Sequence, residues 1–294
     1  MNKLYALIVV MILSASGFSQ TFTWTGGAGA DHKWTTAANW SGGTGYPSTN
    51  AHSVVFNSSA TVAMDAAITV KSISVTGSGS NVVIDGQAAI NSIDITSGDG
   101  NAPTFTVDAN STLDLARMLV VFADNIQGTV NGTLILRGTN NSDYTFFALP
   151  TNAGNPAVFN VNGIIEDKYG TCIDNAIDDY LKFNNGSKLL FSGSAISVPV
   201  ADYNPGSEVS IEGATNQNIS ILERDGVDKL TYNSSLQSAE LQLNIPGHFV
   251  INTLNIDGTN NQTLVLISNS IVDGSSQTNF DFTVTNFTIS GNSN

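Results

Sequence analysis

Three tryptophans near the start of the chain could bind a sugar. Trp24, Trp34 and Trp40 are the only tryptophans among the 294 residues, and they follow one another closely. An exposed aromatic ring presents a broad apolar π face on which a sugar ring can stack. The cluster is therefore a candidate carbohydrate-binding platform. A buried apolar plug is the other interpretation, and the repeat described below favours it.

A cluster of acidic residues in the middle of the chain is a second candidate site. Its members are Glu166, Asp167, Asp174, Asp178 and Asp179. Ca²⁺ favours several carboxylate and carbonyl oxygens, so the cluster is a candidate Ca²⁺ site, but a solvated acidic loop is the preferred interpretation. The sequence contains no EF-hand loop and no nonapeptide Ca²⁺ repeat. We therefore expect no cofactor, and Ca²⁺ is the alternative.

The sequence is poor in catalytic motifs. Serine-hydrolase elbows, phosphate-binding glycine loops and histidine-rich zinc patterns are absent from it. Carboxylates are numerous, but glycoside hydrolysis needs two of them roughly 5 to 10 Å apart, which spacing along the chain does not establish. The single cysteine, Cys172, is predicted to be a small buried apolar residue. We expect no catalysis, with a polysaccharide lyase or glycosidase as the alternative.

The charge balance excludes one class of partner. The chain has 24 acidic and ten basic residues, which gives a formal net charge of −14. Nucleic-acid binding needs clustered Lys and Arg against phosphates, so we expect no nucleic-acid partner. Only 12% of the residues are charged. The surface must therefore be polar mainly through neutral Asn, Ser, Thr and Gly.

The segment 1–19 is predicted to be a secretory signal peptide. Lys3 precedes an apolar run over 4–13, and small residues lead to a cleavage point after Ser19. The run is about ten residues long, whereas a membrane span needs roughly twenty. We therefore expect a secreted or cell-surface protein that begins at Gln20 and has no transmembrane helix in its mature chain.

Most of the remaining sequence has the period-two alternation and β-branched content of short strands. Gly, Asn, Asp and Ser separate these runs, as turn residues do. One stretch, 171–183, also has apolar residues at helical spacing, so a short helix is an alternative there. The clearest predicted strands lie within 68–75, 81–86, 90–96, 104–109, 129–138, 159–165, 208–213, 240–245, 249–258 and 280–291.

A degenerate repeat connects these strands. The segments 109–115, 130–136 and 161–167 align so that Asn110, Asn131 and Asn162 are in register. The first spacing, roughly 21 residues, is about one coil of a β-solenoid, and the second is the same coil with a roughly ten-residue excursion. In such a stack, each coil buries its inward residues against the next coil, and asparagines can form hydrogen-bonded ladders. The repeat predicts an all-β parallel β-helix over 67–294, with tandem β-sandwiches as the alternative.

The aromatic segment then acquires a structural interpretation. The first coil of a solenoid would expose unpaired backbone and an open apolar column. We therefore predict that residues 20–66 form an aromatic cap, in which the tryptophans close the column and Gly-rich turns fold the segment over it.

These residues also carry a resemblance. A T-W-T-G element, a W-T-T-A-A-N-W element, a Gly-rich turn, a proline and a V-x-F strand follow one another over 23–56, and a YNPGS coil opens at Tyr203. This arrangement resembles exported bacterial β-helix surface proteins of the bacteroidete and autotransporter-adhesin type. It differs in having Ala51, His52 and Ser53 where an acidic residue usually precedes the V-x-F strand. The elements comprise Trp24, Gly26, Trp34, Ala37, Ala38, Asn39, Trp40, Pro47, Val54, Val55 and Phe56.

The resemblance implies a right-handed parallel β-helix, export, and a surface or extracellular role without catalysis. We therefore expect a structural or adhesive protein that binds an extracellular polysaccharide or a host or cell surface along its long Thr-, Ser- and Asn-rich face. A polysaccharide-binding or polysaccharide-degrading protein on the same scaffold is the alternative.

Overall fold

The computed structural model describes most of the chain after the predicted signal peptide. Residues 1–18 of that peptide, together with Asp178 and Asp179, lie outside the described residues. The described residues are 19–87, 91–98, 100–137, 146–148, 158–169, 172–174, 180–193, 196–222, 225–246, 249–269 and 283–289.

The described chain is all-β, as predicted, with four sheets and one short 3₁₀ turn, η1 (Ala37–Asn39). Sheet A consists of β1 (Gln20–Trp24), β2 (Trp40–Ser41), β3 (His52–Phe56), β6 (Ser72–Val75), β9 (Thr104–Val107), β12 (Gln127–Val130), β15 (Val158–Val161), β18 (Leu181–Phe183) and β21 (Asp202–Tyr203). Sheet B consists of β4 (Ala60–Ala63), β7 (Asn81–Asp85), β10 (Thr112–Ala116), β13 (Thr133–Arg137), β16 (Ile164–Asp167), β19 (Lys188–Phe191), β22 (Glu208–Ile211), β24 (Gly226–Asn233), β26 (Val250–Gly258) and β28 (Thr283–Ile289). Sheet C consists of β5 (Ile68–Val70), β8 (Asn91–Ile95), β11 (Met118–Phe122), β14 (Phe146–Ala148) and β17 (Ile173–Asp174). Sheet D consists of β20 (Ser197–Val198), β23 (Ile219–Ile221), β25 (Leu241–Pro246) and β27 (Leu264–Asn269).

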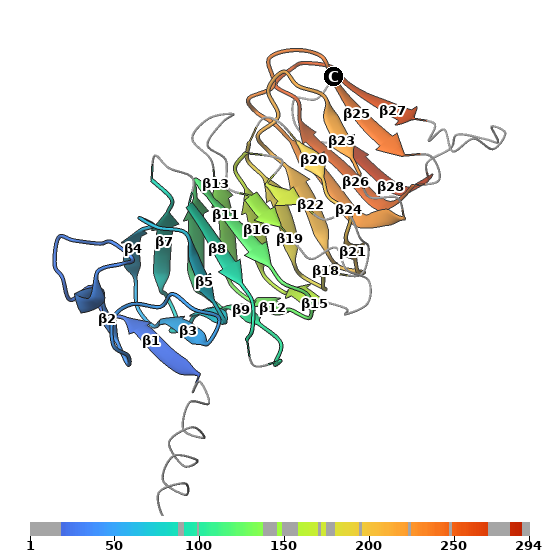
Figure 1. Cartoon of the computed structure of the whole chain (residues 1–294). Coiled ribbons are helices and arrows are strands. Elements are labelled where there is room, and N and C mark those ends of the chain that lie inside the picture. Colours follow the sequence, from blue (N-terminus) through green and yellow to red (C-terminus); the bar gives the residue numbers. More distant parts are fainter. Residues whose placement is uncertain are drawn as a thin grey trace, which may run out of the picture.

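Strand pairing follows a simple rule through most of the chain. From β3 to β16, each strand pairs with the strand three places later, so three successive strands contribute to three different sheets. Apart from the antiparallel pair β1–β2, the pairings among the described strands are parallel. Figure 1 shows the strands stacked along one axis from the N-terminal to the C-terminal part. This parallel arrangement is compatible with the predicted solenoid, whereas tandem sandwiches would be built from antiparallel sheets.

The register of sheet B confirms the predicted repeat. Leu113 pairs with Leu134, and Leu134 pairs with Ile165. These two pairs have the same separations in sequence as the two spacings of the repeat, so the repeat places its segments on neighbouring parallel strands of sheet B. Within the region predicted to permit a short helix, Ile173–Asp174 and Leu181–Phe183 are strands. No helix in the described part of the chain is long and apolar enough to cross a membrane.

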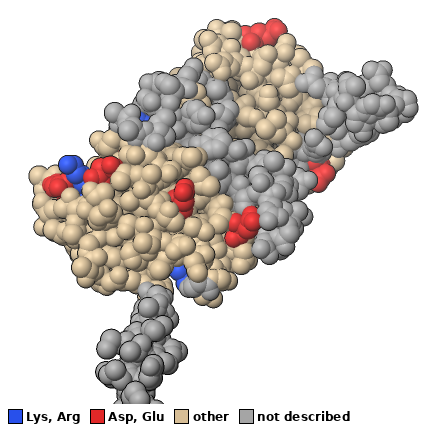
Figure 2. Space-filling view, viewed as in Figure 1, with Lys and Arg blue, Asp and Glu red and all other residues tan. Residues whose placement is uncertain are grey.

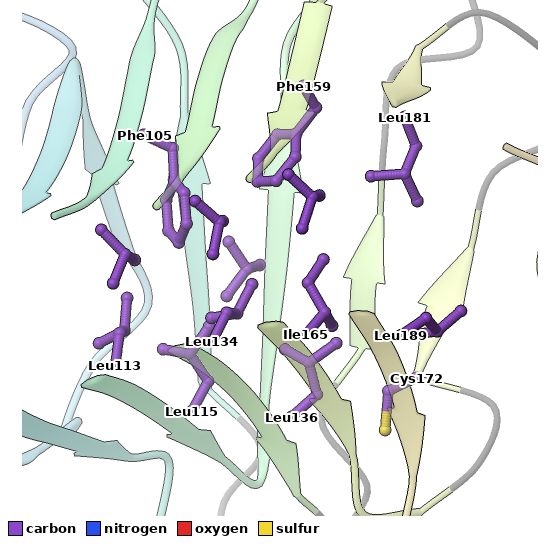
Figure 3. Packing of buried hydrophobic residues seen from close by; sticks show 14 of the residues in the cluster. Phe105, Leu113, Leu115, Leu134, Leu136, Phe159, Ile165, Cys172, Leu181 and Leu189 are labelled. Atoms are coloured by element: carbon purple, nitrogen blue, oxygen red, sulfur yellow. The ribbon is translucent and has the colours of Figure 1, made fainter. Parts of the chain in front are cut away.

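The core is a set of columns that run through the stack. On sheet B, the same inward position is occupied by Val82, Leu113, Leu134, Ile165 and Leu189, all fully buried. Figure 3 shows several of these side chains beside Phe105, Phe159 and Leu181, which belong to sheet A. At about 25 cal/mol per Å² of apolar surface buried, every coil gains stability mainly from contact with its two neighbours.

One glycine makes room for two aromatic rings in a column of sheet A. Gly128 lies between Phe105 and Phe159 in register, and the two ring centroids are 5.7 Å apart. A Cβ atom at Gly128 would lie 2.0 Å from Cδ2 of Phe159. Phe122 of sheet C packs edge-on against both rings. The missing side chain of one coil therefore provides the space that its neighbours fill.

The predicted asparagine ladder is present at the corner after sheet A. Asn162 donates to Asn131 over 2.8 Å, Asn184 donates to Asn162 over 2.9 Å, and Asn204 donates to Asn184 over 3.2 Å. Each bond joins the side-chain amide nitrogen of one coil to the side-chain oxygen of the coil before it. Amide side chains stacked at strand spacing satisfy one another in this way.

The predicted register of Asn110 is wrong on the sheet A side of this corner. Val107 pairs with Val130. The residue in register with Asn131 on the preceding strand is therefore Asp108 and not Asn110. The corner between β9 and β10 is two residues longer than the corner between β12 and β13. Asn110 instead has a φ of 63° in the longer corner, a left-handed conformation that Asn tolerates better than most residues.

We expect substitution of Gly128 by Leu to destabilise the protein by about 1 to 3 kcal/mol, because the new side chain overpacks a filled column. Thermal or urea unfolding followed by far-UV circular dichroism measures this loss. Thr129→Leu, on the next residue of the same strand but pointing outward, is the matched control and should change stability by less than about 0.5 kcal/mol. Equal losses for the two variants would show that the gap at Gly128 is not what accommodates Phe105 and Phe159.

Candidate functional site

The three tryptophans are buried rather than displayed. Trp24, Trp34 and Trp40 are 5%, 0% and 6% exposed. Trp40 packs edge-on against the other two at ring-centroid distances of 4.9 and 4.8 Å. The ring centroid of Phe56, the last residue of β3, lies 6.0 to 6.4 Å from those of all three tryptophans. A sugar platform requires an exposed ring face. The geometry disagrees with a platform and agrees with the plug.

Hydrogen bonds fix the tryptophans in place. The indole nitrogen of Trp34 donates to the carbonyl of Pro47 over 2.8 Å, and that of Trp40 donates to the carbonyl of Trp34 over 2.7 Å. Buried Asn39 holds the intervening turn, because its amide donates to the carbonyls of Asp31 and Lys33. Buried polar groups are thereby satisfied inside the aromatic cluster.

The same segment covers a sheet edge. β4 is the terminal strand of sheet B, and its last residue, Ala63, forms a parallel bridge with Lys33. The amide of Trp34 donates to the carbonyl of Ala63, and the amide of Ala63 donates to the carbonyl of His32. An edge that would otherwise template pairing with another chain is therefore occupied. β3 and β4 already pair with β6 and β7, so the stacked sheets begin inside the range 20–66.

The structure does not bring Glu166 and Asp167 together. They are adjacent on β16, and neighbouring residues of a strand point to opposite faces. Glu166 points outward, where it accepts a hydrogen bond from Ser192 and lies 3.5 Å from the Lys168 ammonium. Asp167 points inward and is fully buried. The two carboxylates therefore lie on opposite faces of sheet B and are not brought together as the Ca²⁺ alternative would need.

Asp167 occupies a position that is apolar in neighbouring coils. It pairs with Leu136 on one side and Phe191 on the other. Its carboxylate accepts hydrogen bonds from the backbone amides of Tyr169 at 2.9 Å and Cys172 at 2.8 Å. These two hydrogen bonds hold the turn that leaves β16, and Cys172 is buried as predicted.

Of the other predicted Ca²⁺ ligands, Asp174 lies on β17 in sheet C, and Asp178 and Asp179 are outside the described residues. Over the described ranges, no group of three or more His, Cys, Asp or Glu side chains could hold a metal ion. The Ca²⁺ alternative gains no support from this part of the structure.

A shallow depression of about 320 Å³ lies where β21, β24 and β26 meet. Two of its carboxylates have structural partners. Asp202 pairs with Lys182 at 3.0 Å, and Asp228 accepts hydrogen bonds from the amide of Gly206 and the side chain of Asn252. Its aromatic member, Tyr203, stacks in parallel on Phe183 at 5.1 Å. Asp202, Asp228 and Tyr203 therefore serve contacts between neighbouring strands and turns.

Ion pairs between coils gather on the outer face of sheet B. Glu208 lies 3.5 Å from Lys188 and 3.3 Å from Lys229, which are its register partners on the two neighbouring strands. Burial alone would raise the pKa of Glu208, but the neighbouring Thr231 hydroxyl and the two lysines together lower it. Figure 2 shows that charged side chains are scattered over a largely uncharged surface. Opposite charges on adjacent strands stabilise the sheet.

The outer face of sheet A is different over its first five parallel strands, which carry hydroxyl groups instead of charges, whereas the Lys182–Asp202 pair lies further along the sheet on β18 and β21. Over β1, β3, β6, β9 and β12, two outward positions per strand form two columns in register. We call these ten residues the hydroxyl face. One column is Thr21, Ser53, Ser72, Thr104 and Gln127, and the other is Thr23, Val55, Ser74, Thr106 and Thr129.

Eight of the ten side chains are Ser or Thr, and none is charged. Adjacent strands are about 4.8 Å apart and outward residues of one strand are roughly 6.7 Å apart, so the hydroxyls form a regular grid. Most of the ten are exposed or half-buried, and Ser72 is the buried exception. A hydroxyl both donates and accepts and can rotate to suit its partner. The grid can therefore bind a flat, neutral, repeating ligand through many weak hydrogen bonds.

The sequence contained a signal for this face. The motifs T-F-T-W, S-I-S-V and T-F-T-V place two hydroxyl residues on one side of a strand and two apolar residues on the other. The general Thr- and Ser-rich character was predicted, but these particular residues were not singled out, because their alignment depends on which strands share a sheet. The register supplies that information.

The nearest histidine adds no charge to this face at neutral pH. His52 begins β3, and its Nδ1 accepts a hydrogen bond from the amide of Ser48 over 3.0 Å. Its ring lies 4.8 Å from that of Phe22. Burial lowers the pKa of His52 below its ordinary value, so the imidazole is neutral in this environment.

No family model, curated protein or solved structure matches this chain. The resemblance to exported β-helix surface proteins therefore stays a prediction, carried by the residues quoted above.

Replacing Trp34 by Ala should destabilise the cap by about 3 to 5 kcal/mol, as expected for a large buried side chain. All three tryptophans lie in the cap, so tryptophan fluorescence reports its unfolding while far-UV circular dichroism reports the sheets. We expect the fluorescence transition to occur at lower urea concentration than the circular dichroism transition in this variant. Thr35→Ala, which removes only a surface hydrogen bond to Asp65, is the control, and a similar effect of both changes would contradict a plugging role.

The Asp85–Arg117 pair on sheet B should contribute to stability in a pH-dependent way. Burial tends to raise the pKa of Asp85, but the hydrogen bonds and charge of Arg117 outweigh it, so the pKa lies below its ordinary value. A carboxylate with a lowered pKa stabilises the fold above its unfolded-state pKa, and this contribution disappears as the pH falls through the folded-state pKa.

We therefore expect Asp85→Asn to lower the free energy of unfolding by about 1 kcal/mol at pH 7, because both side chains remain partly exposed. This difference should shrink as the pH falls below the ordinary Asp pKa of about 3.9 and disappear below the lowered folded-state pKa. Urea unfolding at a series of pH values measures the difference. A loss of the same size at every pH would mean that the charge of Asp85 is not involved.

Proposed function

We propose that this protein is an exported, non-enzymatic adhesive protein that binds neutral polysaccharide through the hydroxyl face. The observation that carries the proposal is the double column of uncharged Ser and Thr side chains on five parallel strands. Each neutral hydrogen bond contributes only about 0.5 to 1.5 kcal/mol. A rigid array of such groups gains affinity because many contacts form without further ordering of the protein.

The proposed scaffold is a right-handed parallel β-helix closed at its N-terminal end by the aromatic cap. Pairing between strands three places apart supports a solenoid, and parallel strands of one sheet are connected by right-handed crossovers almost without exception. The predicted signal peptide supports export, which would bring the hydroxyl face into contact with extracellular or cell-surface glycans.

Charge defines the class of polysaccharide. The protein has a net charge of −14, and the hydroxyl face has no cation that would attract sulfates or uronates. Anionic glycans would therefore be repelled by the molecule and unpaired at the face. Neutral glycans present the hydroxyl groups that Ser and Thr match in both donor and acceptor character.

Binding is tested by cosedimentation with insoluble neutral glucans, mannans and chitin, in parallel with anionic pectate and alginate. We expect retention on at least one neutral polymer, with little change between low salt and about 0.5 M salt, since ion pairs make no contribution. Retention on the anionic polymers alone, or release of reducing ends or unsaturated products during incubation, would overturn the proposal.

The hydroxyl face is tested by Thr106→Val combined with Thr129→Val. Valine keeps the shape and strand propensity of threonine but removes two hydroxyls, so affinity should fall about tenfold, at roughly 0.5 to 1.5 kcal/mol for each lost bond. Thr133→Val, which lies on the outer face of sheet B, is the matched control and should bind like the natural protein. Equal binding by all variants would place the binding site elsewhere.

A further inference from the structure

The two ends of the stack differ. At the N-terminal end, Lys33 and Trp34 cover the edge strand β4 and the tryptophans close the apolar column. At the other end, β28 is the terminal strand of sheet B and β27 is the terminal strand of sheet D. In the described part of the chain, no strand pairs with the outer edge of either one.

The inward columns continue into these last strands and become exposed there. Phe287 pairs with Leu254, and Ile289 pairs with Ile256. Exposure rises from 1% at Leu254 to 54% at Phe287, and from 7% at Ile256 to 59% at Ile289. These two side chains therefore occupy core positions of a coil that nothing described covers.

The edge also lacks the usual protection. Natural edge strands carry charges, prolines or bulges that prevent pairing with another chain. β27 has the sequence L-V-L-I-S-N and β28 has the sequence T-V-T-N-F-T-I, without a charged residue or a proline. In a chain with 24 acidic residues, this uncharged edge is suited to pairing.

From these observations we propose that two copies of the chain associate through their C-terminal edges, with β28 of one copy pairing antiparallel to β28 of the other across a two-fold axis. A second copy presents an apolar column of identical cross-section, which an unrelated partner would have to match by chance. Its edge is equally uncharged, so two molecules of charge −14 meet there without like-charge repulsion at the contact.

The strand sequence also determines a register for this pairing. With Thr288 on the two-fold axis, Phe287 of each copy lies opposite Ile289 of the other, and both point toward the core side. Aromatic and β-branched residues form favourable cross-strand pairs. Because the cap closes the other end of each molecule, assembly stops at the dimer and does not continue into a filament.

The test is the mass of the purified protein in solution, measured by sedimentation equilibrium over a wide concentration range. We expect twice the chain mass for the natural protein and loss of the dimer in Phe287→Lys, with the circular dichroism spectrum unchanged because this side chain is more than half exposed. Leu236→Lys is the matched control, since Leu236 is an exposed leucine (60%) outside β27 and β28, and it should remain dimeric.

Cross-linking tests the register. Cys172 is buried, so an introduced cysteine is the only accessible thiol. Thr288→Cys should form a covalent dimer on mild oxidation, whereas Ser41→Cys, at the exposed residue of β2 at the capped end, should not. A monomer at all concentrations, a dimer that survives Phe287→Lys, or assemblies larger than a dimer would each overturn the proposal.

Discussion

The structure depends on the register between parallel strands of successive coils. Because outward and inward residues alternate along a strand, a shift of one residue would transfer every core side chain to the solvent. The register keeps Leu113, Leu134 and Ile165 in one buried column although the second spacing in sequence is longer than the first. Extra residues are therefore placed in corners and excursions, where they do not disturb the columns.

The same register gives each outer face its own chemistry. On sheet B, it aligns Lys188, Glu208 and Lys229 so that charges of opposite sign alternate along the stack. On sheet A, it aligns hydroxyls with hydroxyls over five strands. Charged pairs thus lie between neighbouring strands of sheet B and between β18 and β21 of sheet A, whereas the ten positions of the hydroxyl face are uncharged. This separation distinguishes a surface that holds coils together from one that is free to bind.

Much of the fold could be predicted from local patterns, because alternation, turn residues and an approximate repeat are all readable in one dimension. The burial of Trp34 could be predicted because the apolar column between the sheets needs a cover at its N-terminal end. The predicted register of Asn110 was wrong because the corner between β9 and β10 has two extra residues, which shift the register on its sheet A side only. The acidic cluster shows a different limit of reading the sequence alone. Glu166 and Asp167 are neighbours in sequence, but the strand separates them onto opposite faces.

Asp167 also illustrates how this stack of parallel strands departs from strict repetition. A carboxylate at an inward position loses its hydration, and it is tolerated because two backbone amides of the following turn donate to it. An apolar residue at this position would continue the column but leave those amides without their acceptor. The presence of Asp167 at an otherwise apolar core position therefore stabilises the turn at which the chain leaves sheet B. Repetition provides the columns, and local exceptions such as Asp167 and Gly128 fit each coil to its own corners and neighbours.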